Sequence, residues 1–111
     1  MVIDLYKQYI KEREGKDIVS DDNGFATYKV NPLCNSSIYV IDVYVVPEKR
    51  QKRIASTYLN KIVDKTDCNF LVTSCDESAN KWEDSEKAIV GYGFKFRKKE
   101  GTLRWYVKEI K

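Results

Sequence analysis

Histidine does not occur in the sequence, and its absence narrows the chemistry available to the chain. Without an imidazole, Ser-His and Cys-His nucleophilic pairs are excluded, and the commonest protein ligand of metals is lost. Cysteine is scarce: there are three, Cys34, Cys68 and Cys75, with no Cys-x-x-Cys pair. This odd number predicts neither a disulfide framework nor a zinc site. We therefore expect no bound metal, and a carboxylate, tyrosine, thiol, lysine or water as the proton carrier.

Long apolar runs are missing as well. No stretch approaches the roughly 20 apolar residues that a membrane-spanning helix needs. The start, Met1 to Asp4, lacks the basic and apolar regions of a secretory signal. We therefore expect a cytoplasmic protein without a membrane contact. The formal net charge of +3 fits an anionic small ligand but disfavours nucleic-acid binding.

The sequence does contain enough apolar material, 42% of residues, to build one core, and its length predicts a single domain over residues 1–111. Apolar residues at helical spacing predict helices, and β-branched or alternating stretches predict strands. The helices are expected over 2–14, 52–65 and 75–90, and the strands over 17–20, 25–30, 38–46, 69–74, 93–97 and 103–110.

This order of elements predicts an α/β (α+β) fold with a single mixed sheet of about six strands and flanking helices. Strands 38–46 and 69–74 are joined by a helix, which indicates a parallel crossover, whereas both ends look like antiparallel hairpins. Ser74 and Glu77 resemble a capping box that opens the helix over 75–90. The expected buried face of the first helix consists of Val2, Leu5, Tyr6, Tyr9 and Ile10.

A basic turn connects the central strand to the following helix. Pro47 ends the strand, and Arg50, Lys52 and Arg53 surround the start of the helix. Free backbone N–H groups and the helix dipole favour an anion at such a place. From these residues alone, the segment is either a pyrophosphate cradle or a solvated surface turn.

The same turn resembles the cofactor-binding signature of the GNAT superfamily, Arg/Gln-x-x-Gly-x-Gly/Ala. It aligns as Arg50-x-x-Arg53-x-Ala55 and follows the family's Val-x-Pro-Glu-x-Arg pattern, which begins here at Val45. Gly93-Phe94 is similar to a Gly-Phe pair near the end of the family's core. The resemblance covers most of the chain, without the usual first strand and one early helix. Arg53 stands where the family has glycine.

The resemblance implies an N-acetyltransferase that moves an acetyl group from acetyl-CoA to a primary amine of a protein or a small molecule. Acetyl-CoA would lie where strand 38–46 parts from strand 69–74, with its pyrophosphate on the amides of the basic turn and its pantetheine arm near Asn80. The implied cofactor-binding residues are Val45, Val46, Arg50, Gln51, Lys52, Arg53, Ile54, Ala55, Ser56 and Asn80.

Two residues are candidates for proton transfer. Asp42 is the lone carboxylate of the central strand, where it must be hydrogen-bonded or face a cavity. We expect it to take a proton from the acceptor ammonium, the alternative being a structural pairing. Tyr92 is a candidate to protonate the leaving thiolate, and its alternative role is core packing. The tyrosine that many family members use would fall at Ile89.

Two other functions stay open from the sequence. Arg53 and Ile89 at motif positions favour a catalytically weak interaction protein on the same scaffold. Basic and aromatic residues along the chain would suit a small nucleic-acid-binding protein, against which the balanced charge argues. The acceptor amine has no recognisable code, and the final strand would allow a homodimer.

Overall fold

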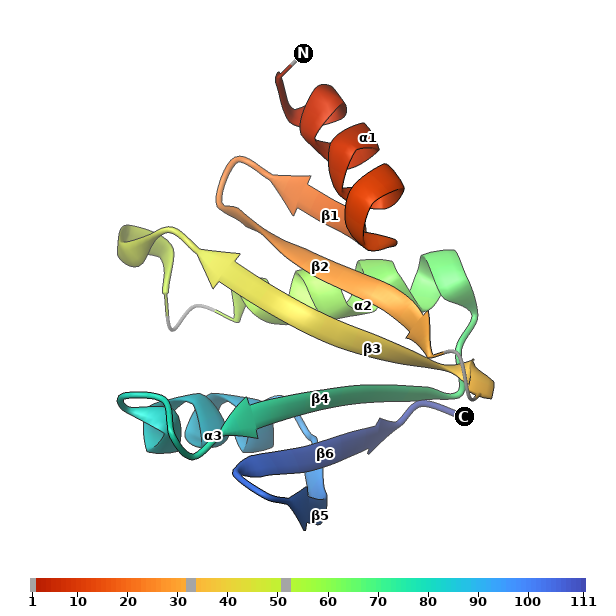
Figure 1. Cartoon of the computed structure of the whole chain (residues 1–111). Coiled ribbons are helices and arrows are strands. Elements are labelled where there is room, and N and C mark those ends of the chain that lie inside the picture. Colours follow the sequence, from red (N-terminus) through yellow and green to blue (C-terminus); the bar gives the residue numbers. More distant parts are fainter. Residues whose placement is uncertain (1, 32–33, 51–52) are drawn as a thin grey trace.

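The computed structural model describes residues 2–31, 34–50 and 53–111. One six-stranded sheet, in the order β1-β2-β3-β4-β6-β5, organises the chain (Figure 1). Its strands are β1 (Asp17–Asp21), β2 (Gly24–Asn31), β3 (Cys34–Val45), β4 (Phe70–Asp76), β5 (Lys95–Glu100) and β6 (Leu103–Glu109), and the helices are α1 (Val2–Glu14), α2 (Ile54–Thr66) and α3 (Trp82–Gly91).

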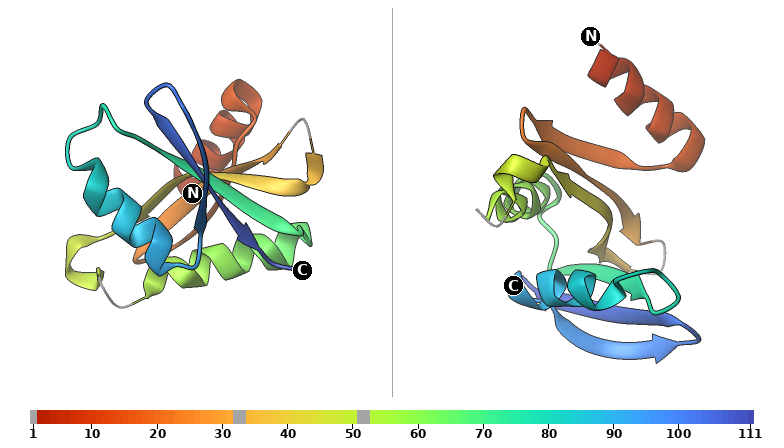
Figure 2. Two further views of the ribbon diagram at one scale, coloured as in Figure 1. Left: turned by 90° about the horizontal axis from the view of Figure 1, so that it is seen from below. Right: turned by 90° about the vertical axis from the view of Figure 1, so that its left-hand side faces the viewer.

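The sheet consists of two arms that meet along a short parallel seam. β1, β2 and β3 are antiparallel neighbours and form the N-terminal arm, while β4, β6 and β5 form the antiparallel C-terminal arm. β3 pairs with β4 only from Ser37 to Tyr39, opposite Phe70 to Val72. Beyond this seam the arms run in different directions (Figure 2). The predicted mixed sheet with terminal hairpins is confirmed.

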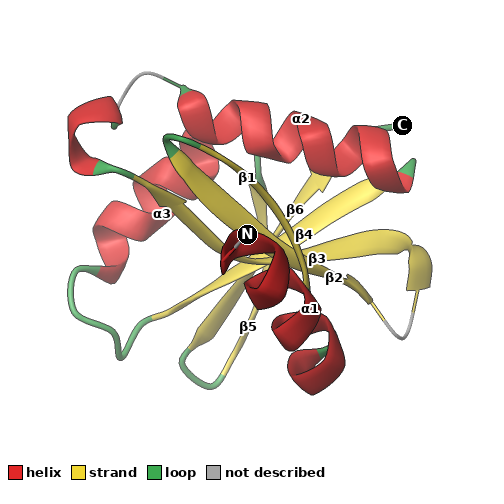
Figure 3. Cartoon of the chain, turned by 90° about the horizontal axis from the view of Figure 1, so that it is seen from above, coloured by secondary structure: helices red, strands yellow, loops and turns green. Residues whose placement is uncertain are grey.

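Helices cover the two faces of the sheet unequally. α2 and α3 lie on one face, and α1 lies on the other, over the N-terminal arm (Figure 3). The core fills the space beneath α2, where Tyr58 and Ile62 are fully buried against strand residues such as Ile38 and Leu71. Within the described ranges, no helix has the length and apolar character needed to cross a membrane.

The third helix begins later than the sequence pattern predicts. Ser74 and Cys75 do not cap or open a helix but continue β4 opposite Trp105 and Arg104. The Asp76 carboxylate then accepts hydrogen bonds from the backbone N–H and the hydroxyl of Ser78, at 2.9 and 2.7 Å. Such an Asx turn reverses the chain before a helix can form. The expected capping box at Ser74 is therefore wrong, and α3 starts at Trp82.

The first helix has the expected bounds but not the expected buried face. Ile10 is 1% exposed, whereas Leu5, Tyr6 and Tyr9 are 68%, 45% and 56% exposed. The side chain of Val2 lies outside the described part. α1 packs against β1 at the edge of the sheet, so that only one flank of the helix is covered.

Candidate functional site

A cleft opens where β3 parts from β4, with α2 on one side and α3 on the other. An inner cavity of about 240 Å³ lies beside the seam, and an outer cavity of about 840 Å³ leads toward the basic turn. Val43, Ala55, Ala88 and Tyr92 line both cavities, which therefore form one continuous cleft. Its size suits an extended ligand that enters from the side of the turn.

A β-bulge explains why the strands separate at this point. Thr27 of β2 is opposite Asp42, and the adjacent Tyr28 is opposite Val40, so Ile41 is the extra residue in β3. An extra residue bends its strand and increases the local twist. The Thr73 hydroxyl donates to the Val40 carbonyl at 3.1 Å and closes the seam. Val40, Ile41 and Thr73 then line the inner cavity.

The end of β3 is tied to the basic turn. Arg50 Nε donates to the Val45 carbonyl at 2.9 Å, and the guanidinium lies 5.6 Å from the ring centroid of Tyr44. The Val46 N–H donates to the Asn23 carbonyl at 2.7 Å, so it is already occupied. A short 3-10 helix, Pro47–Lys49, follows. Gln51 and Lys52, which were predicted to contact the cofactor, lie outside the described residues.

The start of α2 has a backbone conformation that glycine favours. Arg53, the N-cap residue, has φ 58° and ψ 23° and makes no side-chain capping bond. This left-handed region costs a residue with a Cβ roughly 1–2 kcal/mol. Arg53 occupies the position at which the GNAT cofactor-binding signature has glycine. The Ser56 N–H returns to the Arg53 carbonyl at 3.2 Å, whereas the amides of Ile54 and Ala55 occupy first-turn positions that lack intrahelical acceptors.

Positive charge surrounds the outer cavity. Lys49, Arg50 and Arg53 line it from the turn, and Lys87 lines it from α3, with Asp84 as a carboxylate in the same lining. Cations on two walls of a cleft attract an anionic ligand more strongly than any single residue does. Sequence reasoning missed Lys87. Its helical spacing from Asp84 and Gly91 places all three on one face of the helix, and this spacing was the signal that could have found it.

Of the candidate proton carriers, Tyr92 lines the cleft and Asp42 does not, although its neighbours Ile41 and Val43 do. Tyr92 is the C-cap residue of α3, is half-buried and lines both cavities. Asp42 is exposed and accepts a 3.0 Å hydrogen bond from the Thr27 hydroxyl. Thr27 alternates with Ala26 and Tyr28, which belong to the core under α2, so Asp42 lies on the opposite face of the sheet.

The predicted cofactor contacts divide into three groups. Five of them line the outer cavity, three belong to the described residues but do not line the cleft, and two lie outside the described residues. These groups are, in turn, Val45, Arg50, Arg53, Ile54 and Ala55; Val46, Ser56 and Asn80; and Gln51 and Lys52.

Solved structures with a similar architecture include several acetyltransferases. An acetyltransferase from Thermus thermophilus matches with a TM-score of 0.74 at 16% identity, over 98% of this chain and 72% of that one. The chain has the GNAT fold. The PaiA N-acetyltransferase from Thermoplasma acidophilum, solved in complex with coenzyme A, matches with a TM-score of 0.68 at 19% identity over 96% and 69%.

The chain spans only part of the length of the solved structures that it matches. It covers 64% of a GNAT-family protein from Desulfovibrio desulfuricans, which aligns with 82% of this chain at 16% identity and a TM-score of 0.67. No protein-family model matches the sequence. No curated protein matches it either. The comparisons therefore establish the fold and leave the activity of this chain to be proposed.

Proposed function

We propose that the chain is an acetyl-CoA-dependent N-acetyltransferase whose cofactor lies in the cleft between β3 and β4. The observation that carries the proposal is the continuous cleft itself. It runs from the three-residue seam between two parallel strands to a turn and helix start with cations on both walls. A thioester fits the narrow inner end, and the phosphates of coenzyme A fit the wide basic end.

In the proposed reaction, the acceptor nitrogen attacks the thioester carbonyl carbon. A tetrahedral oxyanion forms, an N–H of β3 that faces the cleft stabilises it, and the C–S bond then breaks. The thiolate leaves and takes a proton from the Tyr92 hydroxyl or from water. Catalysis in this scheme comes mainly from holding the amine and the thioester together.

Asp42 is the proposed base. An amine that approaches from the face opposite α2 would meet Asp42, whose neighbours Ile41 and Val43 line the cleft and whose carboxylate is oriented by Thr27. Asp42→Asn keeps the shape and the hydrogen bond from Thr27 but accepts no proton. We expect a fall in kcat of about 100-fold with an unchanged affinity for coenzyme A. Single-turnover kinetics beside calorimetry measure both, and full activity of the variant would remove Asp42 from the mechanism.

Calorimetric titration with acetyl-CoA and with coenzyme A tests the proposed function. The expected result is micromolar binding followed by thiol release when a panel of protein and small-molecule amines is added. Binding without thiol release would favour the interaction-protein alternative. A salt-dependent response to DNA or RNA together with no response to coenzyme A would favour nucleic-acid binding and end the proposal.

A further inference from the structure

α3 forms one wall of the cleft but is held to the sheet by little apolar burial. None of its described residues is fully buried, and Trp82 and Ile89 pack only partly against the core. α2, which forms the other wall, buries Ala55, Tyr58, Leu59 and Ile62. Since most helical stability in proteins comes from tertiary packing, α3 needs a second means of attachment.

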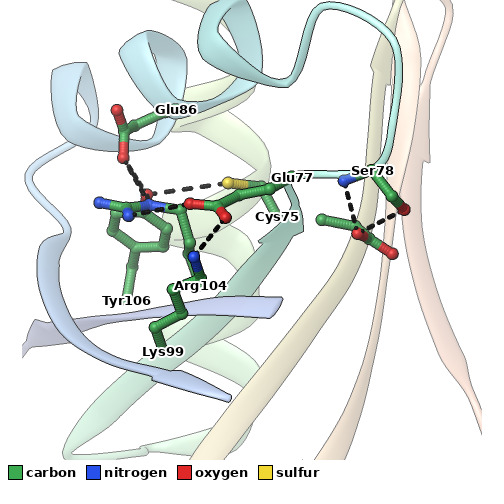
Figure 4. A network of polar contacts seen from close by, with 8 residues as sticks. Cys75, Glu77, Ser78, Glu86, Lys99, Arg104 and Tyr106 are labelled. Atoms are coloured by element: carbon green, nitrogen blue, oxygen red, sulfur yellow. Dashed lines mark hydrogen bonds and ion pairs between the residues drawn. The ribbon is translucent and has the colours of Figure 1, made fainter. Parts of the chain in front are cut away.

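A buried tyrosine supplies this attachment. Tyr106 of β6 is 0% exposed, and its hydroxyl donates to the Glu86 carboxylate of α3 (Figure 4). Arg104 Nε donates to the same hydroxyl at 2.9 Å and to Glu86 Oε2 at 3.0 Å. The buried thiol of Cys75 completes the surroundings of the hydroxyl, 3.7 Å away. Burial, followed by the bond to Glu86, raises the pKa of Tyr106 above its ordinary value of 10.0.

The arginine in this network is itself fixed on several sides. Its second guanidinium nitrogen lies 3.2 Å from Glu77, which also pairs with Lys99 at 2.6 Å (Figure 4). The guanidinium lies over the rings of Phe96 and Trp82, at 4.4 and 5.5 Å from their centroids. A polar network whose members are all satisfied rigidifies the elements that it joins. Here it joins α3 to β4, β5 and β6.

We propose that Glu86, Tyr106 and Arg104 form a latch that positions α3 as the second wall of the cleft and thereby sets the affinity for the cofactor. The three residues are positioning residues, because none of them lines the cleft within the described ranges. Ser85, Ala88 and Ile89 of α3, which do line it, are neighbours of Glu86 on the same helix. The inference rests on the proposed function for the identity of the ligand.

The N-terminal arm offers a matched control. Tyr58 of α2 is also 0% exposed, and its hydroxyl also donates to a carboxylate, that of Asp21. The buried residues of α2 hold that helix without the bond. Tyr58→Phe and Tyr106→Phe therefore make the same chemical change, the loss of one buried hydroxyl, and only the second removes a bond of the latch, leaving Glu86 with its ion pair to Arg104.

The test measures two quantities for the wild type and both variants: the coenzyme A dissociation constant by calorimetry, and amide hydrogen exchange along α2 and α3. For Tyr106→Phe we expect the affinity to weaken about ten-fold, because the free energy of one hydrogen bond corresponds to roughly this change in dissociation constant. Exchange should accelerate over 82–91 and stay unchanged over 54–66. Tyr58→Phe should bind within about two-fold of the wild type.

Equal effects of the two variants on affinity, or unchanged exchange in α3 of Tyr106→Phe, would overturn the latch. A conservative pair sharpens the result: Glu86→Gln keeps an acceptor for the Tyr106 hydroxyl and should bind coenzyme A nearly as the wild type does, whereas Glu86→Ala loses the bonds to both Tyr106 and Arg104 and should weaken binding at least as much as Tyr106→Phe. A wild type that does not bind coenzyme A would overturn the proposed function instead, and the exchange of α3 would still decide whether the latch holds the helix.

Discussion

The two arms of the sheet hold their helices by different means. The N-terminal arm holds α2 by burying one continuous apolar face, in which Tyr58 and Ile62 are 0% exposed. The C-terminal arm holds α3 through carboxylates, a guanidinium and a phenol. Apolar burial is tolerant of small shifts, whereas hydrogen bonds have defined lengths and directions. The cleft thus has one wall, α2, that is held by apolar packing, and a second wall, α3, that is held by directional hydrogen bonds and ion pairs.

The largest difference between the arms should appear when an apolar side chain is removed from each helix. Ile62→Ala in α2 deletes a fully buried side chain, and we expect a loss of about 2–5 kcal/mol of unfolding free energy. Ile89→Ala in α3 deletes a partly buried one, and the expected loss is about 1 kcal/mol. Urea unfolding measures both. Equal losses would mean that α3 is held as α2 is, and the comparison would fail.

A smaller effect should appear at high pH, and it should be alike in both arms. Burial and the bonds to carboxylates raise the pKa of Tyr58 and of Tyr106 above 10.0. In the unfolded chain both phenols ionise near pH 10, so their contribution to stability is complete below that pH and is lost as the pH rises through the raised values. Stability should fall above about pH 10. Each Tyr→Phe variant should reduce the decrease of unfolding free energy with pH above about pH 10. If one variant leaves this pH dependence unchanged, the tyrosine of that arm does not contribute as proposed.

At low pH the stability depends on carboxylates whose pKa values are lowered in the folded chain. The hydrogen bond from Tyr58 lowers the pKa of Asp21, and the hydrogen bond from Lys99 lowers that of Glu77. Their ordinary values are 3.8 and 4.5. The stability that they contribute is present above those values and is lost as the pH falls through the lowered ones. Acid unfolding should therefore begin below about pH 4, with carboxylates of both arms contributing.

The smallest expected effect concerns Arg53, the N-cap residue of α2. Arg53→Gly removes the steric cost of a left-handed backbone conformation, which stabilises the folded chain. Glycine also has more conformational freedom in the unfolded chain, which offsets this gain, so stability should stay within about 1 kcal/mol of the wild type. The same variant removes a cation from the outer cavity and should weaken coenzyme A binding at low salt more than at high salt. Thermal unfolding and calorimetry at two salt concentrations check both. A strong loss of stability would show that Arg53 holds the turn.

Local patterns predicted the elements of this fold well. Three kinds of element depend mainly on neighbours in the sequence, and the structure has all of them. They are the β-branched central strand, the helix whose apolar residues from Ala55 to Val63 recur at helical spacing, and both terminal hairpins. The separation of the two central strands followed from the family resemblance. It could not be derived from periodicity, since a bulge at Ile41 leaves no mark in the alternation of a strand that is apolar on both faces.

The parts that the sequence did not predict depend on contacts between distant residues. Ser74 and Glu77 have the spacing of a capping box, and only the pairing of β4 with β6 shows that Ser74 is in a strand. Glu86 looks like a solvated helix residue until Tyr106, twenty positions later, is placed beside it. Leu5, Tyr6 and Tyr9 are apolar at helical spacing, yet the edge of the sheet covers only the flank of α1 that carries Ile10.

The central claim is that a coenzyme A thioester occupies the cleft between the two arms. Backbone ¹H–¹⁵N spectra recorded during a titration with acetyl-CoA test it residue by residue. The account predicts shifts on both walls together, at Val43 and Val45 of β3, at Ile54 and Ala55 of α2, and from Asp84 of α3 to its C-cap residue Tyr92. Saturating acetyl-CoA that leaves these amides unmoved, or that shifts only the exposed strand β5, would contradict it.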